Sequence, residues 1–247
     1  MFGKKSLSDV LELLRTDEEL SKNITYWHEI EPEEGSYVSF PSQLDDRIKN
    51  ALTNRGITSL YSHQGQAFSS GVQKKSFVAV TPTASGKSLC YHLPVLQQII
   101  EDEESRALYL FPTKALAQDQ KSEVNELIDE IGVDVKCYTY DGDTAPNIRQ
   151  AVRKAGHIVI TNPDMLHSAI LPHHTKWVAF FENLKYIIID ELHTYRGVFG
   201  SHVANVIRRL KRIARFYGSD PVFICTSATI ANPKELAEQL TGKRMEL

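Results

Sequence analysis

Features that would place the chain in a special class of proteins are scarce. It has three cysteines in 247 residues, Cys90, Cys137 and Cys225, and they are too far apart in sequence to follow a metal-binding or disulfide spacing. We therefore expect a reducing, cytoplasmic setting, nucleoid-associated if the source is bacterial. No apolar run approaches the ~20 residues of a membrane span, and the N-terminus lacks the apolar segment of a signal peptide. Repeats and low-complexity tracts are also lacking.

The chain carries little excess charge. Its 28 basic and 31 acidic residues give a net charge of -3. This balance does not by itself indicate nucleic-acid binding, so any basic surface must be local. Hydrophobic residues make up 42% of the chain, and its length suffices for one large α/β domain with a sizeable core.

The most informative stretch is a short apolar run followed by small residues and a helical pattern. Phe77–Val80 predicts a buried parallel strand, and Gly86, Lys87 and Ser88 open a helix over 89–100. This arrangement is typical of phosphate binding, because backbone N–H groups converge on an anion. Lys87 would add a charge for the β- and γ-phosphates, and Ser88 a hydroxyl for Mg²⁺. We predict that the nucleotide is bound by Thr83, Ala84, Ser85, Gly86, Lys87 and Ser88.

A second polar cluster follows the most apolar predicted strand, 186–189. It reads Asp190-Glu191-Leu192-His193. Carboxylates at the carboxyl end of a buried parallel strand are costly unless they have a role. Beside a phosphate loop, Asp190 would hold Mg²⁺ and Glu191 would orient or deprotonate the attacking water. The alternative is an exposed loop after a strand.

Strand-like and helical patterns alternate along the rest of the chain. Alternation of this kind predicts an α/β fold with a mostly parallel β-sheet and helices on both faces. Residues 1–41, with an amphipathic helix over 6–20, are expected to form an accessory segment before a domain over 42–247. Further strands are expected at 107–111, 135–140, 157–161 and 221–225. Further helices are expected after Pro41, from Gln64, after Pro112 to about Ile131, and over 148–155, 162–170, 200–217 and 232–240, with His173 and His174 in a loop.

Three polar positions permit two interpretations each. Gln64 could read both a donor and an acceptor on an adenine edge, or be a surface glutamine at a helix start. Thr113 and Lys114 could hold a backbone phosphate at a helix N-terminus, or form an ordinary cap beside a solvated lysine. The basic face of 200–217 is a solvated surface by default, and a nucleic-acid patch is the weaker alternative.

Taken together, five segments resemble the motifs of superfamily-two helicases, in the same order. These segments are 81–88, 111–120, 161–166, 190–193 and 226–229. Asp-Glu-Leu-His is typical of DExH-type members, and the spacing from Leu44 to Gln64 resembles the adenine-reading Q motif. The string DELHTYRGVFGSHVANVIRRL, which begins at Asp190, is similar to the mitomycin-repair-factor-A (YprA-type) helicases and the Hrq group of RecQ-like DNA helicases.

This resemblance implies a RecA-like P-loop domain, the first ATP-binding lobe of an ATP-dependent DNA helicase. It implies ATP and Mg²⁺ as cofactors, 3′ to 5′ movement on single-stranded DNA, and a role in DNA repair. A second RecA-like lobe of the same polypeptide would supply the arginine finger, so this lobe alone should be nearly inactive. The implied roles are catalysis for Lys87, Asp190, Glu191 and His193, metal binding for Ser88 and Asp190, strand binding for Thr113, Lys114, Gly142, Asp143, Thr144, Thr161 and Asp164, and coupling for Ser227, Ala228 and Thr229.

Two other functions remain open at the level of sequence. An RNA helicase of the same superfamily would carry the same motifs, because they contact the sugar-phosphate backbone. A non-catalytic nucleotide switch or scaffold would share the phosphate loop, but it would have no need of Glu191.

Overall fold

The computed structural model describes residues 6–29, 34–82 and 85–247, and the chain divides into two compact units, residues 1–35 and 36–247. In the part described, no helix is long and apolar enough to cross a membrane. The accessory segment predicted over 1–41 thus overlaps the first unit and the start of the second, and its boundary stays a prediction.

The first unit contains two short helices where the sequence predicted one over 6–20. Helix α1 (Leu7–Thr16) is N-capped by the side chain of Ser6, and α2 (Glu18–Ser21) follows directly. The single-helix prediction is wrong because the Asp17 carboxylate accepts hydrogen bonds from two following N–H groups and starts a new helix. Within this unit the Arg15 guanidinium lies 4.6 Å from the centre of the Trp27 ring.

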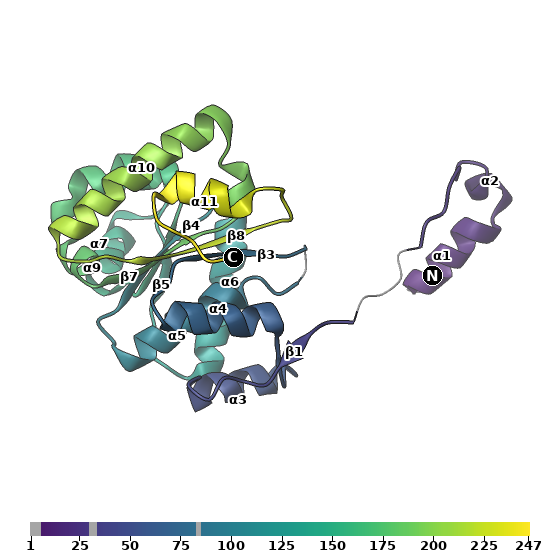
Figure 1. Ribbon diagram of the computed structural model, residues 1–247, viewed down its shortest axis with the longest axis horizontal. Helices are drawn as coiled ribbons and strands as arrows, with labels where there is room; N and C mark the ends of the chain where they lie inside the picture. Colours follow the sequence, from purple (N-terminus) through teal and green to yellow (C-terminus); the bar gives the residue numbers. More distant parts are fainter. Residues whose placement is uncertain (1–5, 30–33, 83–84) are drawn as a thin grey trace. The chain divides into compact units, whose positions relative to one another are not determined.

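The second unit is built on a six-stranded sheet in which every pair of neighbouring strands is parallel. Each strand is mostly apolar and is covered on both faces, as parallel sheets require. Figure 1 shows the sheet between two layers of helices. In spatial order the strands are β3 (Phe77–Val80), β8 (Val222–Ser227), β7 (Leu184–Ile189), β4 (Arg106–Leu110), β6 (Ile158–Thr161) and β5 (Cys137–Thr139).

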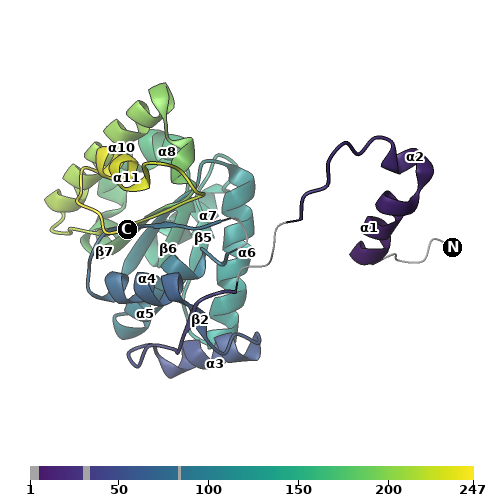
Figure 2. The same ribbon diagram turned by 45° about the vertical axis from the view of Figure 1, so that its right-hand side comes forward.

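Alternate residues of each strand feed two separate cores. On β7, Tyr186 and Ile188 pack into one core, whereas Ile187 and Ile189 pack into the other. The first core is covered by α3 (Asp46–Asn54), α4 (Ser62–Val72), α5 (Leu89–Glu101) and α6 (Lys114–Ile131). The second is covered by α7 (Pro146–Ala155), α9 (Val178–Glu182), α10 (Gly197–Phe216) and α11 (Pro233–Thr241). Figure 2 shows α10 and α11 on this side of the sheet. The predicted parallel sheet with helices on both faces is confirmed.

Smaller elements complete the second unit. Strands β1 (Tyr37–Val38) and β2 (Leu60–Tyr61) form an antiparallel pair beside α4. Helix α8 (Pro163–Met165) continues into a π-helical turn, Leu166–Ile170, and a 3₁₀ turn, Leu171–Lys176. The loop prediction is wrong for His174, which lies in the 3₁₀ turn, whereas His173 has a non-helical backbone, φ −112° and ψ 27°, at a kink within it. The three cysteines are free and buried, Cys90 in α5 and the other two in strands, as predicted.

Candidate nucleotide site

The register of the sheet brings the predicted motifs to one edge. Val80 pairs with Ser227 and Cys225 with Ile189, while Leu110 pairs with both Ile189 and Thr161. Because all these strands are parallel, their carboxyl ends meet at the same edge, where ligands of such folds bind. Segments up to 147 residues apart in sequence therefore begin their loops side by side.

The phosphate loop follows β3 and is folded upon itself. Lys87 Nζ donates to the carbonyl oxygens of Thr81 at 3.1 Å and Pro82 at 3.3 Å. The Ser85 hydroxyl donates to Pro82 O at 2.8 Å. Gly86 has φ +68°, a backbone conformation that glycine adopts at little cost. The predicted positions 83 and 84 lie outside the described residues.

Gln64 is buried, with 3% of its surface exposed, and its amide holds the phosphate loop in place. Its Oε1 accepts from the N–H of Tyr61 at 3.0 Å, and its Nε2 donates to Gly86 O at 2.9 Å. A Cβ added to Gly86 would lie 2.6 Å from Gln64 Nε2, so the two residues fit only because one is glycine. The surface-glutamine interpretation is wrong. Adenine reading stays a prediction, because the amide retains one N–H and one lone pair.

Asp190 lies directly at the end of β7, with 9% of its surface exposed. Its Oδ1 accepts from the hydroxyl of Thr226 on β8 and from the N–H of Glu191 at 2.8 Å. Burial raises the pKa of the Asp190 carboxyl above its ordinary value, while these two donors and Lys87 oppose the rise. Within the described residues, Oδ2 has no hydrogen-bond partner, so this oxygen is available to a cation. The exposed-loop alternative does not describe this carboxylate.

Glu191 is held in an unusual backbone conformation. It has φ +53° and ψ +45°, the left-handed region, which is uncommon outside glycine. Its carbonyl accepts from the N–H and the hydroxyl of Thr194, both at 2.8 Å. One carboxylate oxygen lies 3.2 Å from His193 Nδ1. Conformations of this kind cost about 1–3 kcal/mol and tend to occur at functional sites.

A network of side-chain hydrogen bonds connects the phosphate loop to α6, and the sequence analysis missed it. The Ser88 hydroxyl donates to Glu123 Oε1 at 2.5 Å, and Gln120 Nε2 donates to Glu123 Oε2 at 2.9 Å. Tyr91 completes the network by donating to Gln120 Oε1 at 2.5 Å. Glu123 lies ten residues into a helix whose N-terminus carries Thr113 and Lys114. The sequence analysis did not identify Glu123, because an acidic residue on the polar face of a helix is ordinary.

The aromatic side chains beside the loop were also missed. Tyr61 stacks on Tyr37, with ring centroids 4.8 Å apart, and on His63 at 5.5 Å. His63 Nε2 lies 3.2 Å from Ser85 O, which joins this stack to the phosphate loop. Burial lowers the pKa of His63 below its ordinary value, so the ring favours its neutral form.

The coupling segment 227–229 follows β8. The Ser227 hydroxyl is buried and has no hydrogen-bond partner among the described residues. Its carbonyl accepts from the N–H of Thr81 at 3.4 Å, which ties it to the phosphate loop. Ala228 is half-buried and Thr229 exposed.

The predicted strand-binding residues fall into three groups. Thr113 caps α6, and Lys114 Nζ makes a 2.6 Å ion pair with Asp143. The Thr144 hydroxyl accepts from the N–H of Asp141 at 2.9 Å, which organises the turn that includes Gly142. Thr161 is buried, with its hydroxyl donating to Tyr140 O at 2.6 Å, whereas Asp164 on α8 is exposed. The geometry thus joins the first two groups and leaves Thr161 beneath the surface.

The oxygen atoms at this edge fit a magnesium nucleotide. A serine hydroxyl and a carboxylate oxygen are hard ligands of the kind Mg²⁺ prefers. The Ser88 hydroxyl donates its proton to Glu123, which leaves its lone pairs for a cation. Lys87 and the N-terminus of α5 supply the positive field for phosphates.

Comparison with known proteins identifies the relatives of the chain. A family model described as DEAD/DEAH box helicase matches residues 61–236. "Uncharacterized ATP-dependent helicase YprA" of Bacillus subtilis is 72% identical over 99% of this chain and 32% of that protein. "ATP-dependent helicase hrq1" of Schizosaccharomyces pombe is 40% identical over 85% of this chain and 20% of that protein. The chain therefore spans about a third or less of these curated relatives.

Solved structures agree with this relationship. The structure described as "Crystal Structure of DUF1998 helicase MrfA bound to DNA" is 72% identical, with a TM-score of 0.90 over 98% of this chain and 34% of that chain. The Mycobacterium smegmatis helicase Lhr, bound to ssDNA and AMP-PNP, has a TM-score of 0.73 at 23% identity and supports the RecA-like fold alone. The predicted similarity to YprA-type and Hrq-type helicases is confirmed: the chain belongs to the DEAD/DEAH box helicase family.

Proposed function

We propose that the chain is the ATP-binding lobe of an ATP-dependent DNA helicase. The observation that carries the proposal is the register, which places the loops of Lys87, Asp190 and Ser227 at one edge of the sheet. A phosphate cradle, a buried carboxylate and a buried hydroxyl that meet at this edge are the parts that phosphoryl transfer requires.

In this proposal the phosphate loop and α5 bind the triphosphate of ATP. Lys87 contacts the β- and γ-phosphates, in place of the two carbonyl oxygens that it contacts in this structure. Ser88 and Asp190 hold Mg²⁺, which neutralises charge on the phosphate oxygens. Glu123 keeps the Ser88 hydroxyl oriented, and Gln64 fixes the loop through Gly86 while it faces the adenine.

Glu191 orients the attacking water or accepts its proton. The left-handed backbone at Glu191 and the bonds that Thr194 donates to its carbonyl hold the turn that carries this side chain, and His193 Nδ1 lies 3.2 Å from the carboxylate. Ser227, Ala228 and Thr229 would transmit the state of the nucleotide. The Ser227 carbonyl is bonded to the phosphate loop, and its buried hydroxyl, without a partner among the described residues, could bond to a group that moves with the nucleotide.

The segments that follow β4, β5 and β6 would bind the nucleic-acid strand. Thr113, Lys114 and the turn at 142–144 form one connected surface, held by the ion pair between Lys114 and Asp143. Asp164, exposed on α8, and Thr161, bonded to Tyr140 O, would complete the strand-binding set. These residues contact the sugar-phosphate backbone and therefore carry little sequence specificity.

We propose DNA rather than RNA as the strand. The names of relatives support this choice, since they include "ATP-dependent DNA helicase Hel308" of Pyrococcus horikoshii at 32% identity and the MrfA structure bound to DNA. A role in DNA repair and 3′ to 5′ movement rest on the resemblance to the YprA-type and Hrq-type helicases. An RNA helicase is the second candidate, because the contacts proposed for the motif residues are with the sugar-phosphate backbone and choose poorly between DNA and RNA.

A second RecA-like lobe of the same polypeptide completes the proposed motor, and residues 1–41 serve as an accessory segment in the cytoplasm. The share of its relatives that this chain covers supports the two-lobe organisation. Without the arginine of that lobe, ATP turnover by this chain should stay near background, because such a residue contributes about 10³–10⁵ to the rate.

The test is ATP turnover by this chain within its full-length protein, with no nucleic acid, with single-stranded DNA and with single-stranded RNA. Stimulation by DNA that is lost in Glu191→Gln supports the proposal. Stronger stimulation by RNA favours the RNA helicase. Turnover absent under all conditions, with ATP still bound, favours the nucleotide switch.

A further inference from the structure

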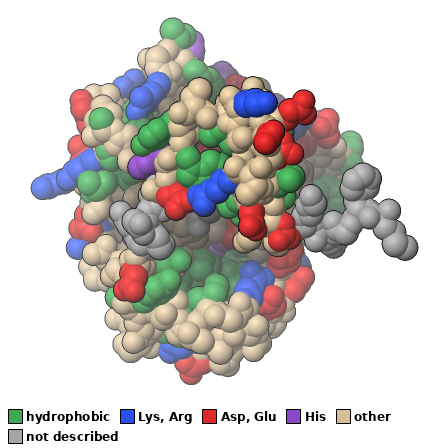
Figure 3. Space-filling view, turned by 90° about the vertical axis from the view of Figure 1, so that its right-hand side faces the viewer, with side chains coloured by type: hydrophobic (Ala, Val, Ile, Leu, Met, Phe, Trp, Pro, Cys, Tyr) green, Lys and Arg blue, Asp and Glu red, His purple; other side chains and the backbone are tan. Residues whose placement is uncertain are grey.

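One stretch of the chain has a charge unlike the rest. Residues 192–219 contain six basic and no acidic residues, against 22 basic and 31 acidic residues elsewhere in the chain. Most of this stretch is α10, whose buried side packs on the sheet through Val203, Ile207 and Leu210. Elsewhere, as on the face in Figure 3, basic and acidic side chains are interspersed.

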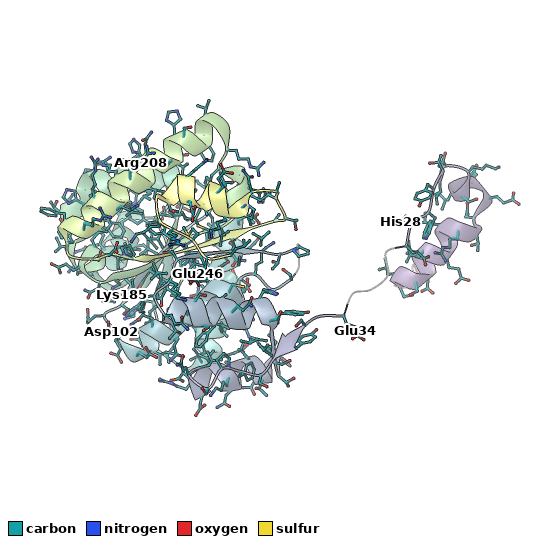
Figure 4. All side chains as sticks on the ribbon, viewed as in Figure 1. His28, Glu34, Asp102, Lys185, Arg208 and Glu246 are labelled. Atoms are coloured by element: carbon teal, nitrogen blue, oxygen red, sulfur yellow. The ribbon has the colours of Figure 1, made fainter. Side chains whose placement is uncertain are left out.

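The basic residues of α10 line a groove of about 800 Å³ between this helix and the segment that begins with α8. Five cations line it: Arg208, Arg209, Lys211, Arg212 and Arg215. Asp164 is the one acidic residue of its lining. Figure 4 shows Arg208 on α10, across the sheet from Asp102 at the end of α5.

Three of these arginines have nothing to neutralise them. Arg209, Arg212 and Arg215 make no hydrogen bond or ion pair within the part of the chain that the structure describes, whereas Lys211 donates to Thr241 O at 2.7 Å. Burial and the neighbouring cations Lys243 and Arg215 lower the pKa of Lys211. Like charges at i, i+3 and i+4 destabilise an isolated helix, so their clustering here calls for a partner.

The lining of the groove also includes an exposed aromatic side chain. Phe199 is 42% exposed, and its ring stacks at 5.7 Å on buried Tyr195. His167 and His202 line the groove beside it. An aromatic platform next to a row of cations is the combination that binds single-stranded nucleic acid, because each base has a face to stack and each nucleotide a phosphate.

We propose that this groove binds a single strand of nucleic acid as a second contact surface, continuous with the strand path at Asp164. This inference rests on the proposed function only in its claim that the groove continues the strand path at Asp164. Phe199 stacks one base, and Arg209, Arg212 and Arg215 contact successive phosphates of the strand beyond the motor residues. The exposed ring of Phe199 beside the row of arginines favours a single strand, whose unpaired bases can stack on the ring while its phosphates meet the cations.

The test measures binding of fluorescent dT20 to the 247-residue chain by anisotropy at several salt concentrations. The triple variant Arg209→Gln/Arg212→Gln/Arg215→Gln should bind about tenfold more weakly, and the slope of log affinity against log salt should fall by about two, at about 0.7 per phosphate contact. Phe199→Ala should weaken binding about fivefold. The control Lys154→Gln/Lys234→Gln/Arg244→Gln removes the same charge from exposed sites and should change binding less than twofold.

A Lys114→Ala variant separates this inference from the proposed function. If Lys114→Ala weakens dT20 binding and the arginine triple variant does not, the groove inference is overturned while the proposed function stands. If the triple variant weakens dT20 binding and Lys114→Ala does not, the groove inference stands and the proposed strand path fails.

Two further results test what occupies the groove. An equal loss of affinity in the triple variant and its control would show that only net charge matters. Displacement of dT20 by polyglutamate at equal charge concentration would identify an acidic protein segment as the occupant. Either result overturns the inference.

Discussion

Two regions of the second unit present charge in different ways. At the carboxyl edge of the sheet, Lys87, Asp190 and Glu191 are each held by neighbouring groups at defined distances. In the α10 groove, Arg209, Arg212 and Arg215 project without a partner among the described residues. The first arrangement suits a ligand whose atoms must be placed for chemistry, whereas the second suits a backbone of repeated charge.

This difference leads to a difference in what mutations should do. Changes at the edge should alter affinity for one ligand sharply and depend on Mg²⁺ and pH. Changes in the groove should act additively and depend on salt. The predictions below test this contrast from the largest expected effect to the smallest.

Lys87→Ala should give the largest effect. It removes the cation of the phosphate loop, so affinity for Mg–ATP should fall at least 100-fold, about 2.7 kcal/mol. A fluorescent ATP analogue measures it. Lys185→Ala is the matched control, because Lys185 lies at the opposite end of the sheet, near the start of β7. Equal affinities for the two variants would show that the phosphates bind elsewhere.

Asp190→Asn should weaken Mg–ATP binding about tenfold while it stabilises the fold by about 1 kcal/mol. Burial raises the pKa of Asp190, so the carboxylate costs folding free energy once it ionises. The stabilising contribution of the protonated acid is present at low pH and lost as pH rises through the folded pKa. The gain in the variant should therefore be seen at neutral pH and vanish in acid.

Urea unfolding at pH 7 and pH 3.5 measures this stability difference. A variant less stable than the parent at pH 7 would mean that the bonds from Thr226 and Glu191 outweigh the cost of burial.

Glu123→Gln should weaken Mg–ATP binding about fivefold, since a neutral acceptor polarises the Ser88 hydroxyl less than a carboxylate does. Binding of ADP without Mg²⁺ should not change. Glu126→Gln, on an exposed position of the same helix, is the control. An equal loss for both nucleotides would indicate a general effect on the loop instead of an effect on the metal ligand.

The smallest effect concerns His92, behind the edge in α5. Burial lowers its pKa to about 3. The ring stays neutral in the folded protein but takes up a proton near pH 6.5 in the unfolded chain. Lowering the pH from 7 to 5.5 should therefore reduce the free energy of unfolding by about 1 kcal/mol. His92→Gln should flatten this dependence in urea titrations. An unchanged slope would assign the acid sensitivity to other groups, such as His157, whose pKa burial also lowers.

The sequence predicted the edge well because its signals are local. The strand Phe77–Val80 and the start of the following helix at Leu89 were predicted correctly, since an apolar strand and a helix meet at a glycine-containing turn. The helix that runs to Ile131 was also predicted, since Thr113 caps its start and Gly132 ends it. Asp190 was singled out because a charge directly after four apolar residues has few structural explanations.

The parts that the sequence analysis missed depend on individual side-chain contacts that hydrophobic periodicity does not reveal. Gln64 was named from the Q-motif spacing, but its bond to Gly86 O was not foreseen, and nothing in the segment around Glu123 indicates its bond to Ser88. The break at Asp17 reflects one side chain that caps a second helix. The basic face of α10 was interpreted as a solvated surface with a nucleic-acid patch as the weaker alternative, because periodicity does not reveal which cations line a groove with a second element.

The most direct test of the account is a crystal structure of this chain with Mg²⁺ and AMP-PNP. We expect the β- and γ-phosphates within hydrogen-bond distance of Lys87 Nζ, and the metal bound by the Ser88 hydroxyl and held by Asp190, directly or through water. A nucleotide bound away from the carboxyl edge of the sheet, or a metal without Ser88 and Asp190 around it, would contradict the account.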